Sequence, residues 1–101
     1  MTDTFPPKTA YTLGAQMNKS ALSVPSNIAE GTSRRSMKDQ TRFTEIAYGS
    51  LMELLCQATI ATEVSLITEA QFTNLRTLIE ETASSLSALR KSQLQRKISS
   101  K

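Results

Sequence analysis

The sequence has no histidine and no tryptophan, and it has only one cysteine and three glycines among 101 residues. Without histidine the chain offers no imidazole base and no His-ligated metal site. A single cysteine forms neither an intrachain disulfide nor a CxxC redox pair. Neither the phosphate-binding string G-x-x-x-x-G-K-[ST] nor the dinucleotide-binding string G-x-G-x-x-G occurs. We therefore expect no cofactor, no metal and no enzymatic activity.

Long apolar runs are also missing. No run approaches the roughly 20 residues that a membrane span requires, and no charged and then apolar segment marks a signal peptide. These absences predict a cytoplasmic protein that makes no membrane contact. The hydrophobic residues that are present, 39% of the chain, suffice for one small domain. For this size, folding buries about 65% of the extended chain's surface, which leaves a thin margin of stability.

Charge is distributed unevenly around a formal net charge of +3. Residues 1–44 carry a net charge of +3, residues 45–88 a net charge of −5 and residues 89–101 a net charge of +5. If this segregation survives folding, it creates local fields of opposite sign.

Apolar residues recur at three- and four-residue steps in three stretches, and no stretch alternates as a strand would. We therefore predict an all-α protein, an antiparallel up-and-down helical bundle over residues 10–92. Its helices are placed at about residues 10–30, 37–65 and 69–92. Residues 1–9 include Phe5-Pro6-Pro7 and are expected to form an extended lead-in. Residues 93–101 are expected to be a basic tail that frays.

Local signals mark the ends of the predicted helices. Gly31 is expected to stop the first helix. Ser36, which precedes Asp39 by three residues, is expected to cap the second helix. Thr68 and Gln71 form a capping box before the third. The links between the helices are therefore expected to be short.

Three residues inside the predicted helices are unusual there and need an explanation. Pro25 removes a backbone hydrogen bond, and we expect it to kink the first helix without ending it, because the apolar spacing continues through Ile28. Gly49 costs a helix about 1 kcal/mol relative to alanine, so we expect a neighbouring helix to approach it closely. Cys56 is expected to be a small buried hydrophobe and not a nucleophile.

Two blocks of the sequence have unusual local chemistry. The first block is Pro25-Ser26-Asn27-Ile28-Ala29-Glu30-Gly31. The second begins with Arg42-Phe43 and continues through Ile46-Ala47-Tyr48-Gly49-Ser50-Leu51 to Glu53-Leu54. These blocks resemble the P-S-N-I-A-E-G and R-F-x-x-I-A-x-G-S-L-x-E-L motifs of the four helix bundle protein family, also called 23S rRNA intervening-sequence proteins. The resemblance covers about residues 5–92, and Phe5-Pro6-Pro7-Lys8 is similar to the family's F-P-K opening.

The resemblance implies an antiparallel four-helix bundle without catalytic residues. It also implies a homo-oligomer, in some members a pentameric ring, and a bacterial origin with a link to rRNA genes and nucleic acid. The family normally has one more helix before F-P-K, whereas here Met1 stands four residues before Phe5. We therefore expect three of the family's four helices, through a misplaced start codon or a real truncation. Three such helices leave an apolar groove bare.

Basic residues gather around the predicted start of the second helix and after the third. Charge-assisted hydrogen bonds and free backbone N–H groups at a helix start both suit phosphate. The candidate nucleic-acid-binding residues are Arg34, Arg35, Lys38, Arg42, Arg90 and Lys91. The alternative interpretation is a solvated basic face that forms salt bridges with Asp39 and Glu45.

Four other residues have two interpretations each. Asn27 and Glu30 suit a recognition site, but we interpret them as helix-end hydrogen bonding and a subunit contact, with Glu30 paired to an arginine of the following link. Tyr11 and Tyr48 suit base stacking, but we interpret them as packing residues.

These features together predict a noncatalytic homo-oligomer that binds RNA or DNA, mostly through phosphate. Two alternatives stay open. One is a scaffold that holds a protein partner against its apolar groove and its acidic segment, residues 45–88. The other is a truncated fragment with no independent function.

Overall fold

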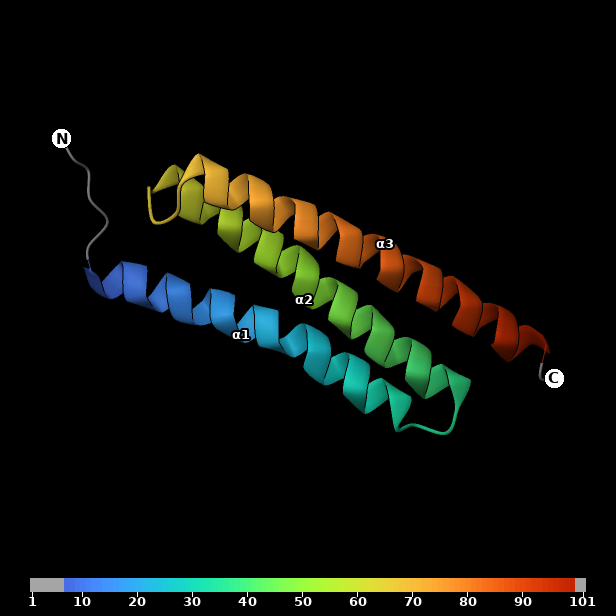
Figure 1. The fold of residues 1–101 in the computed structure, drawn as a ribbon. Helices are drawn as coiled ribbons and strands as arrows, with labels where there is room; N and C mark the ends of the chain where they lie inside the picture. Colours follow the sequence, from blue (N-terminus) through green and yellow to red (C-terminus); the bar gives the residue numbers. More distant parts are fainter. Residues whose placement is uncertain (1–6, 100–101) are drawn as a thin grey trace.

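The structure is a computed structural model that describes the backbone of residues 7–99 and the side chains of residues 8–96. Its helices are α1 (Pro7–Thr32), α2 (Met37–Glu63) and α3 (Glu69–Ser99). Consecutive helices run in opposite directions, so the two links lie at opposite ends of a molecule of 62 × 22 × 13 Å (Figure 1). The protein is therefore an all-α helical bundle, as the sequence predicts. Within residues 7–99, no helix combines the length and apolar character needed to cross a bilayer.

The outer helix ends differ from the predicted ones. α1 begins at Pro7, inside the expected lead-in, because proline lacks an N–H group and its fixed φ suits the first helical position. α3 continues through the expected tail to Ser99. There, Thr44 Oγ1 donates to Gln93 Oε1 at 2.8 Å, and both residues are buried. Basic side chains near a helix C-terminus also favour its dipole. The extended segment predicted before Pro7 lies outside the described residues.

The inner helix ends carry the predicted caps. Ser36 Oγ accepts a hydrogen bond from the backbone N–H of Asp39 at 3.0 Å. The N–H of Gln71 donates to Thr68 Oγ1 at 3.1 Å, and the N–H of Thr68 donates to Gln71 Oε1 at 2.9 Å. Both links are therefore set by short-range hydrogen bonds that the sequence signals on its own.

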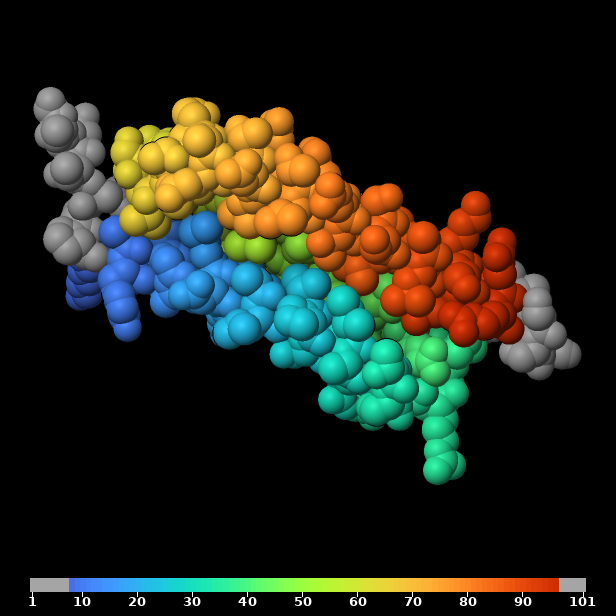
Figure 2. Space-filling view, viewed as in Figure 1, coloured from blue at the N-terminus to red at the C-terminus, as the bar shows by residue number. Residues whose placement is uncertain are grey.

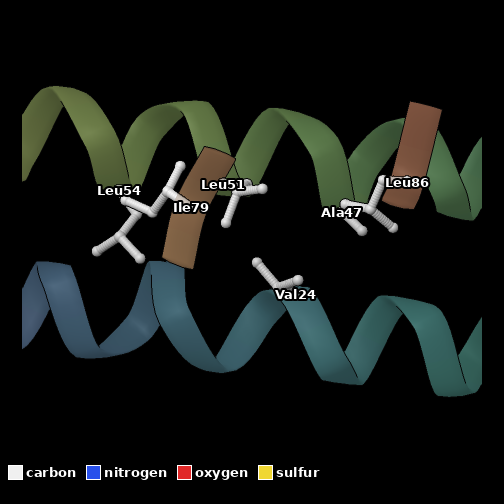
Figure 3. Close-up of a cluster of buried hydrophobic side chains, with 6 residues drawn as sticks. All are labelled: Val24, Ala47, Leu51, Leu54, Ile79 and Leu86. Carbon is white, nitrogen blue, oxygen red and sulfur yellow. The ribbon is translucent and has the colours of Figure 1, made fainter. Parts of the chain in front are cut away.

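The core is a single cluster to which all three helices contribute side chains (Figure 3). Ala47 is fully buried, and Ile79 is 2% exposed. The buried cluster consists of Val24, Ala47, Leu51, Leu54, Ile79 and Leu86. α1 and α3 both pack against α2, but no Cα atom of α1 comes within 8 Å of one in α3. The bundle is therefore a layer of three helices and not a closed triangle.

On the face that Figure 2 shows, α1 and α3 lie side by side and cover most of α2. An open apolar groove between them is lined by residues of all three helices. Leu78, on the α3 wall, is 60% exposed. The residues that line the groove are Ala21, Val24, Pro25, Leu51, Leu54, Leu75, Leu78, Ile79 and Thr82. Exposed apolar side chains of this kind are stabilised when another surface covers them.

Three expectations about single residues are wrong. A Cβ atom on Gly49 would meet nothing within 4 Å, so no helix approaches it. Gly49 lies two residues from Ala47 and from Leu51, which places it on the opposite, solvent-facing side of α2. Cys56 is exposed as well. Gly31 does not stop α1, because the helix continues to Thr32 and Gly31 has no positive φ.

Candidate nucleic-acid interface

The link between α1 and α2 and the last turns of α3 lie at the same end of the molecule (Figure 1). This arrangement brings the two predicted groups of basic residues to one end, although more than forty residues separate them in sequence. We call this region the basic end. It consists of Arg34, Arg35, Lys38, Arg42, Arg90 and Lys91, which are all exposed.

An aromatic ring orders two of these cations. The guanidinium carbon of Arg34 lies 5.0 Å from the centroid of the Phe43 ring, and that of Arg42 lies 4.8 Å from it. At these separations the ring attracts a cation by its quadrupole and still leaves the guanidinium N–H groups at the surface. Phe43 therefore holds two hydrogen-bond donors of the kind that suits phosphate.

Two of the six cations are already paired with carboxylates. Arg34 forms an ion pair with Glu30, as predicted, and Arg90 Nε donates to Glu45 Oε2 at 2.7 Å. Both pairs are about half exposed, so each adds at most about 1 kcal/mol to stability. Glu45 therefore pairs with a cation of α3 and not with the predicted cations near the start of α2, and Asp39 forms no ion pair among residues 8–96.

The other four cations differ in this respect. Among the residues whose side chains are described, Arg35, Lys38, Arg42 and Lys91 take part in no ion pair. Within residues 8–96, no carboxylate therefore contacts these four positive charges of the basic end. They are the groups best able to exchange counterions for phosphate.

The start of α2 contributes less than the sequence suggests. Its cap already uses the N–H of Asp39, and the N–H of Gln40 donates to the Ser36 carbonyl at 3.0 Å. The Asp39 carboxylate lies in the first turn, where its negative charge opposes an incoming phosphate. The candidate interface therefore depends on basic side chains and not on free backbone N–H groups at the start of α2.

The two family-like blocks contact each other across the α1–α2 interface, which the sequence analysis did not foresee. Asn27 Nδ2 donates to the carbonyl and the hydroxyl of Ser23 at 2.8 and 2.9 Å. The Ser23 and Ser50 hydroxyls lie 2.7 Å apart and share a hydrogen bond. A Cβ on the buried Gly31 would lie 3.1 Å from the Cβ of Phe43, so only glycine fits there without a shift. Gly31 of the first block therefore packs against Phe43, whose ring lies beside two arginines of the basic end.

The remaining residues of the first block have simpler surroundings. Ile28 packs against the core cluster, whereas Ser26 and Ala29 are exposed. Pro25 lies inside α1, which continues past it as predicted, and it lines the apolar groove. Asn27 and Glu30 each contact a residue four positions away in the chain, and the predicted subunit contact stays a prediction.

The two tyrosines differ. Tyr11 is 78% exposed near the start of α1, far from the basic end, so its interpretation as a packing residue is wrong. Tyr48 is partly exposed and lies next to the Glu45–Arg90 ion pair in a shallow pocket between α2 and α3. Of the two rings, only that of Tyr48 lies where a base could stack beside the basic end.

A family model described as the 23S rRNA-intervening sequence protein matches residues 1–88. The chain belongs to this family. The match includes α1, α2, most of α3 and both sequence blocks. A comparison with curated proteins gives no match. Among the described residues of this family member, no three cysteine, aspartate or glutamate residues gather as metal ligands would.

Proposed function

We propose that this member of the 23S rRNA-intervening sequence protein family is a noncatalytic homo-oligomer that binds nucleic acid, RNA above all, through its basic end. The observation that carries the proposal is the set of four uncompensated cations at one end of a rod-like molecule. The family match supports RNA as the first ligand to test. We place this binding in a bacterial cytoplasm, as the family resemblance implies.

The chemistry of the basic end favours backbone contacts over base recognition. Lysine and arginine side chains on an open surface bind phosphate by charge and carry little sequence information. One chain with about four such contacts binds weakly. Several copies in one assembly raise the avidity without any new contact.

The direct test is a fluorescence-anisotropy titration of a structured RNA at about 50 and about 200 mM salt. Release of counterions from about four phosphates predicts that the affinity falls by roughly 100-fold between the two concentrations. Absence of binding by the folded, assembled protein at the lower concentration would contradict the proposal.

A pair of lysine variants tests where the RNA binds. Lys38→Gln removes an uncompensated cation from the basic end, whereas Lys19→Gln removes an exposed lysine from the other half of the molecule. We expect Lys38→Gln to reduce the slope of log affinity against log salt by about one, and Lys19→Gln to leave it nearly unchanged. Equal slopes for both variants would show that the basic end is not the binding surface.

A protein scaffold is the second candidate function. Five exposed glutamates lie in the half of the molecule away from the basic end. They are Glu53, Glu63, Glu69, Glu80 and Glu81. Affinity purification after nuclease treatment separates the two functions, because a stoichiometric protein partner with no loss on nuclease treatment favours the scaffold.

A further inference from the structure

The shallow pocket between α2 and α3 lies next to the basic end, and the phosphate contacts proposed above do not use it. No residue of α1 lines this pocket. Its lining residues are Thr44, Glu45 and Tyr48 from α2 and Leu86, Ser87 and Arg90 from α3. Arg90 belongs both to the pocket and to the basic end, so a nucleic acid bound at the basic end lies close to the pocket.

Two buried residues hold the pocket in shape. Leu86 is 3% exposed and belongs to the core cluster. Thr44 is buried as well, and its hydroxyl donates to Gln93 Oε1 at 2.8 Å. These contacts fix α2 and α3 relative to each other at this level of the bundle. The pocket is therefore formed before any ligand arrives, so binding there needs little ordering of the chain.

The size and the walls of the pocket suit a single planar ring system. Its volume is about 260 Å³, slightly below the roughly 300–1,000 Å³ of pockets that enclose drug-sized ligands. Tyr48 is 37% exposed, and together with Leu86 it offers aromatic and apolar surface. Nucleic-acid bases stack on aromatic side chains, and this stacking depends little on which base is present. The pocket can therefore accept one base but not a whole nucleotide.

The charges in the pocket favour an uncharged polar ligand over phosphate. Glu45 and Arg90 are its only ionisable groups of opposite charge, and they form an ion pair with 2.7 Å between Oε2 and Nε. Because the two charges cancel, a phosphate gains little attraction inside the pocket. The remaining guanidinium N–H groups and the second carboxylate oxygen suit the acceptors and donors on the edge of a base. The pocket thus differs in chemistry from the cations of the basic end.

Only an unpaired base can enter such a pocket. A base inside a duplex is stacked on both faces and hydrogen-bonded along its edge, whereas a base in a loop or a single strand can turn outward. Lys91 follows Arg90 in the chain and takes part in no ion pair among residues 8–96, so it is a suitable contact for the adjoining phosphate. Phosphate contacts alone would not distinguish bases that are paired from bases that are not.

We propose that the pocket between α2 and α3 binds one unpaired base, which stacks on Tyr48 and meets the Glu45–Arg90 pair with its edge. The inference rests on the proposed nucleic-acid binding and deepens it, because it names unpaired segments as the preferred ligand. The basic end supplies the phosphate contacts, and the pocket adds the selection of single strands and loops over duplexes.

Two single-stranded RNA oligomers with the same number of phosphates test the pocket. One oligomer carries its bases, and the other carries ribose without bases. In fluorescence-anisotropy titrations of the full chain at about 50 mM salt, we expect the first to bind more tightly by roughly 5- to 150-fold. Equal affinities would overturn the base pocket and leave phosphate binding at the basic end in place. Absence of binding to both oligomers would contradict both proposals.

Tyrosine variants test whether the preference for bases comes from the pocket. Tyr48→Leu removes the ring but keeps an apolar side chain, and it is expected to lower the affinity for the oligomer with bases to that for the oligomer without them. Tyr48→Phe keeps the ring and is expected to keep the preference. Tyr11→Leu is the matched control, because Tyr11 is 78% exposed in the other half of the molecule. A preference that survives in Tyr48→Leu would overturn the assignment.

A measurement on the unaltered pocket decides the proposal if circular dichroism shows that Tyr48→Leu does not fold. The chain has only two tyrosines, so incorporation of 3-fluorotyrosine gives two ¹⁹F NMR signals, and Tyr11→Phe identifies which one belongs to Tyr48. We expect the oligomer with bases to shift the Tyr48 signal, and the oligomer without bases to leave it nearly in place. A Tyr48 signal that responds alike to both oligomers would overturn the base pocket.

Discussion

The two sides of α1 differ in how closely they pack against the rest of the chain. On the side toward α2, the Asn27–Ser23–Ser50 hydrogen bonds and the close approach of Gly31 to Phe43 fasten the helix within one chain. On the side toward α3, α1 offers apolar surface that no backbone approaches. The comparison teaches that the two blocks hold α1 against α2 and leave its side toward α3 less closely packed.

The largest expected effect on stability comes from Ile79, a buried core residue of α3. Ile79→Ala removes a side chain of α3 that is 2% exposed, belongs to the core and lines the groove. We expect the free energy of unfolding to fall by about 2–5 kcal/mol, because a cavity forms in a small core. Urea denaturation measures the change. Ile60→Ala, at an exposed isoleucine of α2, is expected to cost less than about 1 kcal/mol.

Two glycine substitutions compare the α1–α2 interface with the solvent-facing side of α2. Gly31→Ala places a methyl group 3.1 Å from the Cβ of Phe43. Because a Cβ atom is fixed to the backbone and cannot rotate away, we expect this variant to lower the free energy of unfolding by about 1–3 kcal/mol. Gly49→Ala meets no neighbour within 4 Å and is expected to stabilise by about 0.5–1 kcal/mol through helix propensity alone. Thermal unfolding of both variants checks the opposite signs. A Gly31→Ala change that does not destabilise would show that Gly31 is not a packing glycine.

The hydrogen bonds of the fastened side give the smallest expected effect. Ser50→Ala removes the partner of Ser23 and is expected to cost about 1 kcal/mol. Ser26→Ala is the control, because Ser26 is exposed and its change is expected within about 0.5 kcal/mol. A double-mutant cycle between Ser23 and Ser50 measures their coupling directly. A coupling energy of zero would mean that the hydrogen bond does not stabilise the interface.

Much of the fold follows from the sequence, because helical periodicity and capping are local. In α3, the apolar residues Ile79 and Leu86 lie at helical spacing, and both are buried. The errors have physical reasons. The two prolines predict an extended segment through residue 9, but α1 begins at Pro7 because proline suits the first helical position. Gln93 extends α3 through a contact with Thr44 that lies 49 residues away.

The candidate site is predictable in composition but not in arrangement. Clusters of arginine and lysine are visible in the sequence, and the Glu30–Arg34 pair follows from helical spacing. The Glu45–Arg90 pair joins residues 45 positions apart, so it depends on how far α3 is shifted along α2. Periodicity shows which face of a helix is buried but not that shift. The position of Arg34 over Phe43 depends in the same way on the angle of the short link.

The central place of α2 has a consequence for synthesis on the ribosome. α1 emerges first and finds no surface to cover it until Phe43 and Ser50 have followed, so the α1–α2 hairpin is the earliest unit able to hold together. α3 docks last and completes the shared core with Ile79 and Leu86. No Cα atom of α1 lies within 8 Å of one in α3, so α3 depends mainly on α2 and is the element expected to exchange its amide hydrogens by the lowest-energy opening.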